Sequence, residues 1–195
     1  NCFAQELDIE VTNALALKGI GGILGVNKNG SVSNTYSTGK IKANKEYVGG
    51  IVGYNSDIVN KCFSTVNLES TAGNIGGIIG YNSYTSSSGI PVKYNLYLGD
   101  IYTTINLSNR ISGNASIDNT NFGYENQKFT GIDVANESVE LLSYNEIFNI
   151  NYYDDENNLV ATESMDLSTH DPYGNPYIGF VVTARLEDQD TFDRI

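Results

Sequence analysis

Short apolar runs bounded by glycine recur at a fixed interval in the first half of the chain. They read GGILGVN at Gly21–Asn27, GGIVGYN at Gly49–Asn55 and GGIIGYN at Gly76–Asn82. The runs start at residues 21, 49 and 76, so the spacing is 28 and then 27 residues. A fixed period of this length is typical of stacked coils, each one a supersecondary unit. The pattern predicts a mainly β fold, a glycine-rich β-solenoid of about three to four coils.

Two neighbouring columns of these runs are apolar throughout: Ile23, Ile51 and Ile78, followed by Leu24, Val52 and Ile79. Neighbouring residues of an extended strand face opposite sides, so both faces of such a strand are at least partly apolar. The pattern leaves open which column faces inward and favours the Gly-Ile-Gly-Asn face.

Asparagine ends each run, at Asn27, Asn55 and Asn82. Identical amides stacked at equivalent corners can form a ladder of hydrogen bonds. Asparagine also tolerates the left-handed backbone that a corner needs. We therefore expect an asparagine ladder along the stack.

The stretch GGIVGYNSDIVNKCFSTVNL, residues 49–68, resembles a GLUG repeat, a glycine-rich repeat of bacterial surface and secreted proteins. The second half of the motif reads NTYSTGKI at Asn34–Ile41, KCFSTVNL at Lys61–Leu68 and NLYLGDI at Asn95–Ile101. The resemblance covers roughly residues 1–104. It implies a structural or adhesive segment, such as the non-catalytic parts of immunoglobulin A1 protease-type surface proteins.

Further strands and an aromatic column are expected between the glycine runs. Leu7, Ile9 and Val11 alternate with acidic residues, which predicts a half-exposed strand. Tyr36, Phe63 and Tyr97 are expected to share one column. Stacking from coil to coil is the favoured interpretation of this column, and a carbohydrate platform is the alternative.

Charge divides the chain. Its 195 residues carry a net charge of −12, but residues 1–105 hold seven acidic residues and seven lysines. Residues 106–195 hold the other 16 acidic residues and four basic ones. This shift predicts repeats over 1–104 and a small acidic β-rich or α+β domain, or a solenoid cap, over 105–195. The acidic balance argues against nucleic acid as a partner.

Three elements are expected in the second half. Asn136 could cap a helix over Glu137–Phe148. The segment Asn151–Val160 reads as a strand, a turn and the start of a second strand, and Tyr177–Leu186 reads as another strand.

Two cysteines, Cys2 and Cys62, fall in one column of the repeat with Thr35 between them. Strands two coils apart lie about 9–10 Å from each other, which exceeds the reach of a disulfide. We expect two small buried thiols.

An insertion in the third repeat predicts a projecting loop at Ser83–Pro91. Tyr84, with Ser86 and Ser87, is the candidate binding site, because insertions in repeat proteins often lie on the binding face. A tolerated surface loop is the alternative.

Clustered oxygens at Asp154, Asp155 and Glu156 suggest a calcium site, although the alternating acids and central glycine of an EF-hand are absent. A second acidic cluster comprises Glu187, Asp188, Asp190 and Asp193. Solvated acidic turns are the alternative at both places.

No catalytic constellation emerges. His170 is the single histidine, and its neighbour Asp171 cannot complete a triad from the adjacent position. We expect a non-catalytic structural or adhesive module that contacts a host or cell-surface protein or glycan. The alternatives are a self-assembling extracellular filament subunit and, least favoured, a β-helix enzyme acting on polysaccharides.

The expected location is extracellular or on the bacterial cell surface. The sequence contains no run of 18 continuous apolar residues, so no membrane-spanning helix is expected in it. The opening Asn1-Cys2-Phe3 resembles the middle of a repeat, so we expect a longer parent protein that carries the secretion and anchoring signals.

Overall fold

A computed structural model describes residues 2–12, 19–83, 92–104, 108–114, 120–124, 128–130, 139–142, 149–153 and 159–164. The chain forms two compact units, Asn1–Leu141 and Leu142–Ile195. The described residues are mainly β-strand and contain no helix, so the predicted fold class is confirmed at this level. Accordingly, no described helix is long and apolar enough to cross a membrane.

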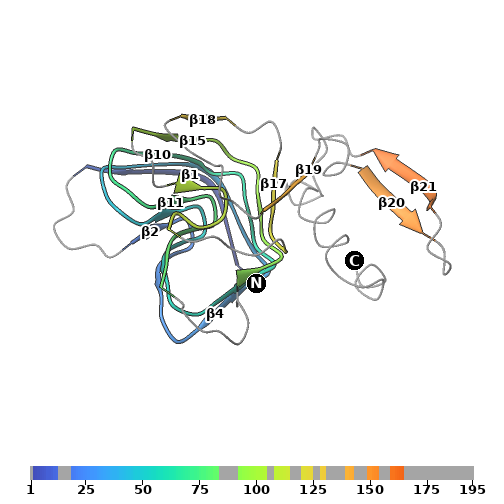
Figure 1. Cartoon of the computed structure of the whole chain (residues 1–195), viewed down its shortest axis with the longest axis horizontal. Helices are drawn as coiled ribbons and strands as arrows, with labels where there is room; N and C mark the ends of the chain where they lie inside the picture. Colours follow the sequence, from blue (N-terminus) through green and yellow to red (C-terminus); the bar gives the residue numbers. More distant parts are fainter. Residues whose placement is uncertain are drawn as a thin grey trace. The chain divides into compact units, whose positions relative to one another are not determined.

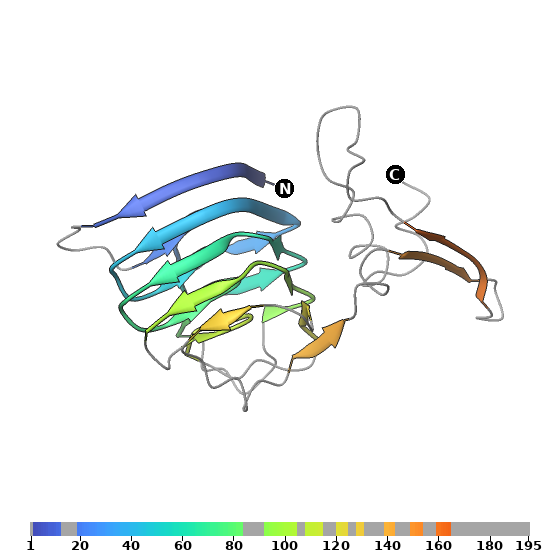
Figure 2. The ribbon, with the colours of Figure 1, turned by 90° about the horizontal axis from the view of Figure 1, so that it is seen from above.

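The first unit contains a long sheet built mainly of parallel strands (Figures 1 and 2). One row of neighbours runs through β1, β5, β10, β15 and β18, and Figure 2 shows these strands side by side from dark blue to yellow. A second row joins β5 to β9, β14, β17 and β19. The strands are β1 (Cys2–Val11), β5 (Thr35–Ala43), β9 (Phe63–Ser64), β10 (Asn67–Ser70), β14 (Leu96–Tyr97), β15 (Ile101–Thr103), β17 (Phe122–Tyr124), β18 (Phe129–Thr130) and β19 (Glu140–Leu142).

Three smaller parallel sheets take strands from the same repeats. One comprises β2 (Ile20–Gly21), β6 (Val48–Gly49), β11 (Ile75–Gly76) and β16 (Ser108–Asn109). The next comprises β3 (Leu24–Asn27), β7 (Val52–Asn55) and β12 (Ile79–Asn82), and the last β4 (Ser31–Ser33), β8 (Ile58–Asn60) and β13 (Val92–Lys93). Each glycine run therefore supplies one strand to each of two sheets, and equivalent residues stack in register.

The glycine run is two strands joined by a bend, rather than the single extended strand that the sequence suggested. In the second repeat β6 ends at Gly49 and β7 begins at Val52. A β-carbon on Gly49 would lie 2.0 Å from the carbonyl oxygen of Val52, so the bend requires glycine there. Because the chain turns, Ile51 and Val52 both point into the core instead of to opposite faces.

The asparagine ladder is confirmed. Asn27 donates from Nδ2 to Oδ1 of Asn55 at 2.8 Å, and Asn55 donates likewise to Asn82 at 3.0 Å. All three side chains are buried. The amides satisfy one another where water is excluded, which stabilises the corner and holds successive repeats in register.

Parallel pairing continues after the recognisable repeats end. Strand β16 pairs with β11, and β18 pairs with β15. Ile111 lies in the column of Ile78 and is also buried, with the Ile78 amide donating to its carbonyl oxygen at 3.2 Å. The boundary predicted near residue 105 concerns independent domains and stays a prediction, but the stacking of strands passes through it.

The described part of the second unit is a hairpin of β20 (Asn149–Tyr153) and β21 (Leu159–Ser164), paired antiparallel. This confirms the two strands predicted over Asn151–Val160. The helix expected over residues 137–148 is wrong at Glu140–Leu142, which form β19 in the long sheet. Pairing with a neighbouring strand outweighed a helical period that the apolar residues fitted only in part. The strand expected at residues 177–186 lies outside the described residues.

Candidate functional site

An aromatic stripe crosses the long sheet on three strands. The rings of Phe3 and Tyr36 are stacked at a centroid distance of 5.4 Å, and those of Tyr36 and Phe63 at 5.1 Å. Exposure falls along the stripe, from 63% at Phe3 to 8% at Phe63. Both faces of the Tyr36 ring are occupied by stacking, and Phe63 is buried, so the outer face of Phe3 is the open one. This favours the coil-to-coil stacking interpretation over a carbohydrate platform.

Tyr97 does not belong to this stripe, contrary to the sequence expectation. Its register partner is Ser64, and Leu96 is the residue that pairs with Phe63. The Tyr97 ring is fully buried and fills the space beside Gly77, where a β-carbon would lie 2.1 Å from the ring. Its hydroxyl donates toward the carbonyl oxygens of Val66 (2.9 Å) and Asp100 (3.0 Å). Burial raises the pKa of Tyr97 well above its usual value, so the phenol remains neutral.

The sequence contained a signal for the correct register. Tyr36 precedes Ile41 by five residues, and Phe63 precedes Leu68 by the same five. Five residues before Ile101 is Leu96, not Tyr97. The prediction placed Tyr97 with Tyr36 and Phe63 because all three are aromatic. This choice shifted the third repeat by one residue from its true register.

A second aromatic cluster, not anticipated from the sequence, joins Tyr47, Tyr54 and Tyr81. Tyr54 and Tyr81 are register partners on β7 and β12, with stacked rings 5.6 Å apart. Tyr47 lies 4.6 Å from Tyr81 by ring centroids. Burial, followed by the nearby Glu46 carboxylate, raises the pKa of Tyr47. All three rings are half-buried, so they offer ring edges and hydroxyls to a contacting partner.

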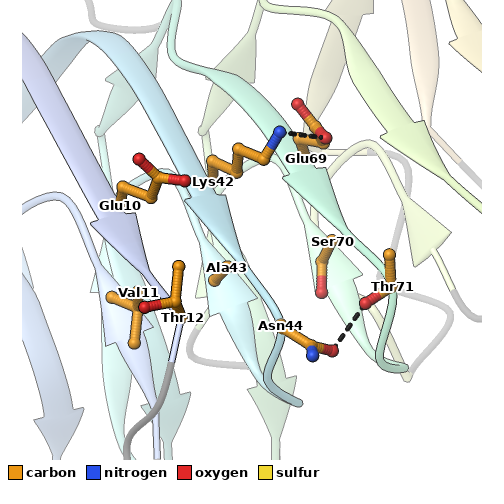
Figure 3. A pocket seen from close by; sticks show the side chains of 9 residues that line it. All are labelled: Glu10, Val11, Thr12, Lys42, Ala43, Asn44, Glu69, Ser70 and Thr71. Carbon is orange, nitrogen blue, oxygen red and sulfur yellow. Dashed lines mark hydrogen bonds and ion pairs between the residues drawn. The ribbon is translucent and has the colours of Figure 1, made fainter.

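A small depression of about 70 Å³ lies across the ends of β1, β5 and β10 (Figure 3). Three tripeptides in register line it, at residues 10–12, 42–44 and 69–71. Lys42 forms an ion pair with Glu69, with Nζ and Oε1 2.9 Å apart. Thr71 donates from Oγ1 to Oδ1 of Asn44 at 2.5 Å. Ligand pockets for small molecules are several times larger, about 300–1,000 Å³, so the depression does not enclose one.

The charges here alternate between strands. Glu10, Lys42 and Glu69 are register partners on β1, β5 and β10. The hydrogen bond and the charge of Glu69, with a smaller effect of Glu10, raise the pKa of Lys42. A lysine with a raised pKa stays protonated at neutral pH, so Lys42 is suited to charge recognition rather than to proton abstraction or nucleophilic attack.

The cysteines occupy the predicted column but differ in exposure. Cys2 pairs in register with Thr35, and both cysteines are free thiols. Cys62 is buried as predicted, and burial raises its pKa to about 12. Cys2 is exposed, contrary to prediction, because β5 is the only described strand that pairs with β1.

The binding and calcium sites predicted from the sequence are not among the residues that the structure describes. Tyr84, Ser86 and Ser87 lie outside the described residues, as do Asp154, Asp155 and Glu156. Within the described parts of the chain, no group of three histidine, cysteine or acidic side chains could hold a metal ion. The binding and calcium assignments therefore stay predictions.

Comparison of the chain with protein-family models, with curated proteins and with solved structures found no match. The resemblance to GLUG repeats thus rests on the motifs themselves.

Proposed function

We propose that the stacked strands of the first unit form a β-solenoid, with GLUG-type repeats over residues 1–104, and that it serves as a non-catalytic structural or adhesive module. Its setting would be a secreted or cell-surface bacterial protein, and its partner a surface protein or glycan. The observation that carries the proposal is the repeated supply of one strand to each of several parallel sheets in strict register. Such an array buries its repeated side chains and leaves its outer faces for contacts.

The interior supports a load-bearing role. The ladder of Asn27, Asn55 and Asn82 connects successive repeats through buried hydrogen bonds. A column of isoleucines, Ile51, Ile78 and Ile111, is fully buried and connected by backbone hydrogen bonds. Each repeat contacts its neighbours, so stability accumulates along the stack, as a stalk or spacer requires.

An adhesive role is tested by screening the full chain on arrays of glycans and matrix proteins, with and without calcium. Tyr84→Ser removes the candidate contact of the inserted loop, and Tyr94→Ser is the matched control at an exposed tyrosine of the described structure. We expect a specific hit that Tyr84→Ser abolishes and Tyr94→Ser retains. Absence of any hit would contradict adhesion and leave the spacer role.

The calcium and enzyme alternatives have their own measurements. Calorimetric titration of the chain with calcium, compared with an Asp154→Asn/Asp155→Asn variant, should give heat that the variant loses. A titration without heat would contradict the calcium site. Release of reducing sugar from a polysaccharide panel would contradict the non-catalytic assignment.

A filament subunit is the second candidate, because apolar side chains are exposed on edge strands of the described sheets. Phe3, Leu24 and Val26 are all exposed on strands that have no described neighbour on one side. Stacking of copies end to end would cover them. Light scattering across concentration would show growing mass for a filament and constant mass for a spacer.

A further inference from the structure

Tyr47 stands at a corner that does not suit a bulky residue. It immediately precedes β6 and has a left-handed backbone, with φ at 63°. The equivalent residue one repeat later, before β11, is Asn74 with φ at 61°. Asparagine adopts this conformation at lower cost than tyrosine, and strained residues of this kind cluster at functional sites.

The corner is held firmly by the neighbouring repeats. The Tyr47 amide donates to the carbonyl oxygen of Gly73 at 3.3 Å, and the Tyr47 carbonyl oxygen accepts from the Ile20 amide at 2.9 Å. Gly80 lies against the corner, and a β-carbon there would be 2.3 Å from the carbonyl carbon of Tyr47. Glycine at this position therefore lets the corner approach β12, the strand that carries Tyr81.

The rings of Tyr47 and Tyr81 form the closest pair of the second aromatic cluster. Their centroids lie 4.6 Å apart, and their planes are inclined by 44°. This separation is at the short end of the range for aromatic pairs, about 4.5–7 Å, so carbon atoms of the two rings are in van der Waals contact. The Tyr54 ring lies farther from both, at 6.0 Å from Tyr47 and 5.6 Å from Tyr81. All three rings are half-buried, so their edges are accessible from solvent.

The Glu46 carboxylate provides a proton acceptor beside this pair. It accepts a hydrogen bond from the Tyr47 hydroxyl, and burial together with this nearby charge raises the pKa of Tyr47, so the phenol is neutral at physiological pH. A phenol becomes strongly acidic when it loses an electron, so its oxidation is helped by a base that takes the proton. The chain contains no tryptophan, which leaves tyrosine as its most readily oxidised aromatic residue.

We propose that Tyr47 and Tyr81 are an oxidative cross-linking site, which forms a dityrosine bond between adjacent repeats when the chain meets hydrogen peroxide and a haem peroxidase. Each phenol loses one electron and one proton, and the two phenoxyl radicals couple through ring carbons next to their hydroxyl groups. Each coupled carbon then releases its hydrogen as a proton, and the oxygen of the same ring is reprotonated. The two electrons and two protons removed overall reduce one hydrogen peroxide to two waters. The bond would fasten two repeats covalently, whatever partner the array binds.

Oxidation of the full chain with hydrogen peroxide and a haem peroxidase tests the proposal. Dilute protein favours bonds within one molecule, and a reducing agent afterwards removes any disulfide formed by the exposed Cys2. We expect the monomer to lose two hydrogen atoms in mass and to gain dityrosine fluorescence. Tyr47 and Tyr54 share one tryptic peptide, residues 46–61, so phenylalanine variants are needed to assign the bond.

Tyr47→Phe and Tyr81→Phe each keep the ring but remove a coupling hydroxyl, and each should nearly abolish the monomeric product. Tyr54→Phe should retain it. Tyr94→Phe, which should also retain it, is the matched control, because Tyr94 is exposed and likewise left-handed, with φ at 57°. An unchanged yield in Tyr47→Phe, a loss in Tyr54→Phe alone, or no monomeric product from the natural chain would overturn the proposal.

Glu46→Gln separates the proton acceptor from the geometry. Glutamine keeps the length of the side chain but does not take a proton. The same bond should therefore form roughly tenfold more slowly, since water must accept the proton instead. An equal rate in this variant would contradict the role of Glu46, whereas a bond at other residues would contradict the geometry.

The cross-link should also stabilise the array. Its ends, at positions 47 and 81, are 34 residues apart, and closing this loop restricts the unfolded chain as a disulfide does. The melting temperature of the purified product should rise by roughly 5–15 °C, with oxidised Tyr47→Phe as the control. An unchanged melting temperature would contradict a bond between the two repeats. Because no ligand is involved, failure of these tests leaves the array screen with Tyr84→Ser unaffected.

Discussion

The first strand of the stack and the strands behind it share a residue pattern but differ in what the pattern achieves. Ile9 on β1 and Ile41 on β5 are register partners, and both point toward the core. Ile41 has a strand on each side and is fully buried, whereas Ile9 has one and is half-buried. Burial in this array therefore depends on the number of stacked neighbours as much as on residue type.

Truncation of a core side chain should affect the middle of the stack most. Ile41→Ala should lower the free energy of unfolding by about 2–5 kcal/mol, because it leaves a cavity between two strands. Ile9→Ala should cost clearly less, since part of its side chain already contacts water. Urea denaturation of both variants measures the difference, and equal losses would show that β1 is covered in solution.

The asparagine ladder allows a second comparison, between a polar side chain in the middle of the ladder and one at its end. Asn55 accepts from Asn27 and donates to Asn82, so Asn55→Ala removes a buried hydrogen bond from each of these two neighbours. We expect a loss of about 1–3 kcal/mol. Asn27→Ala, at the end of the ladder, should lose less in the same denaturation experiment. The reverse order would contradict a ladder held by its central member.

Tyr97 and Tyr36 differ in the direction of their hydroxyl groups, inward and outward respectively. Tyr97→Phe removes a fully buried hydroxyl that donates to backbone carbonyl oxygens and should cost about 0.5–1.5 kcal/mol. Tyr36→Phe removes an outward hydroxyl that accepts from Nε2 of Gln5 and should be close to neutral. Thermal unfolding of the two variants distinguishes them, and similar melting temperatures would argue against the burial of Tyr97.

The smallest effect concerns the surface charges. Because the folded pKa of Lys42 is raised above its ordinary value of 10.5, its stabilising contribution is fully present below that value. The contribution is lost as the pH rises through the raised pKa. Glu69→Gln should remove most of this dependence and change stability little at neutral pH, since the pair is exposed and screened by salt. Melting temperatures between pH 9 and 12 test this, and an unchanged slope in the variant would contradict it.

The sequence predicted well wherever equivalent residues keep the same spacing in successive repeats. The asparagine ladder and the pairing of Tyr36 with Phe63 followed from the period alone. A second ladder was missed because its column changes identity along the stack. There Asn95 donates to Oδ1 of Asn121 at 2.9 Å, in the column that holds Cys62 one repeat earlier.

The fourth glycine run was missed for a similar reason. Asn109 and Arg110 stand where the earlier repeats have two glycines, and the spacing from Ile78 to Ile111 grows to 33 residues. The remaining signal was Ile111 followed two residues later by Gly113, which reproduces the end of the motif. Register pairing identifies a degenerate repeat that residue identity alone conceals.

The period and the asparagine corners could be read from the sequence, because stacking by translation places each residue on its equivalent in the next repeat. The burial of individual side chains emerged only from the three-dimensional arrangement of the strands. The bend after Gly49 turned two neighbouring apolar columns to the same side, and a side chain's place in the stack set how much of it water reaches. The pattern within one repeat does not encode the degree of burial, because burial depends on how many strands lie beside a residue.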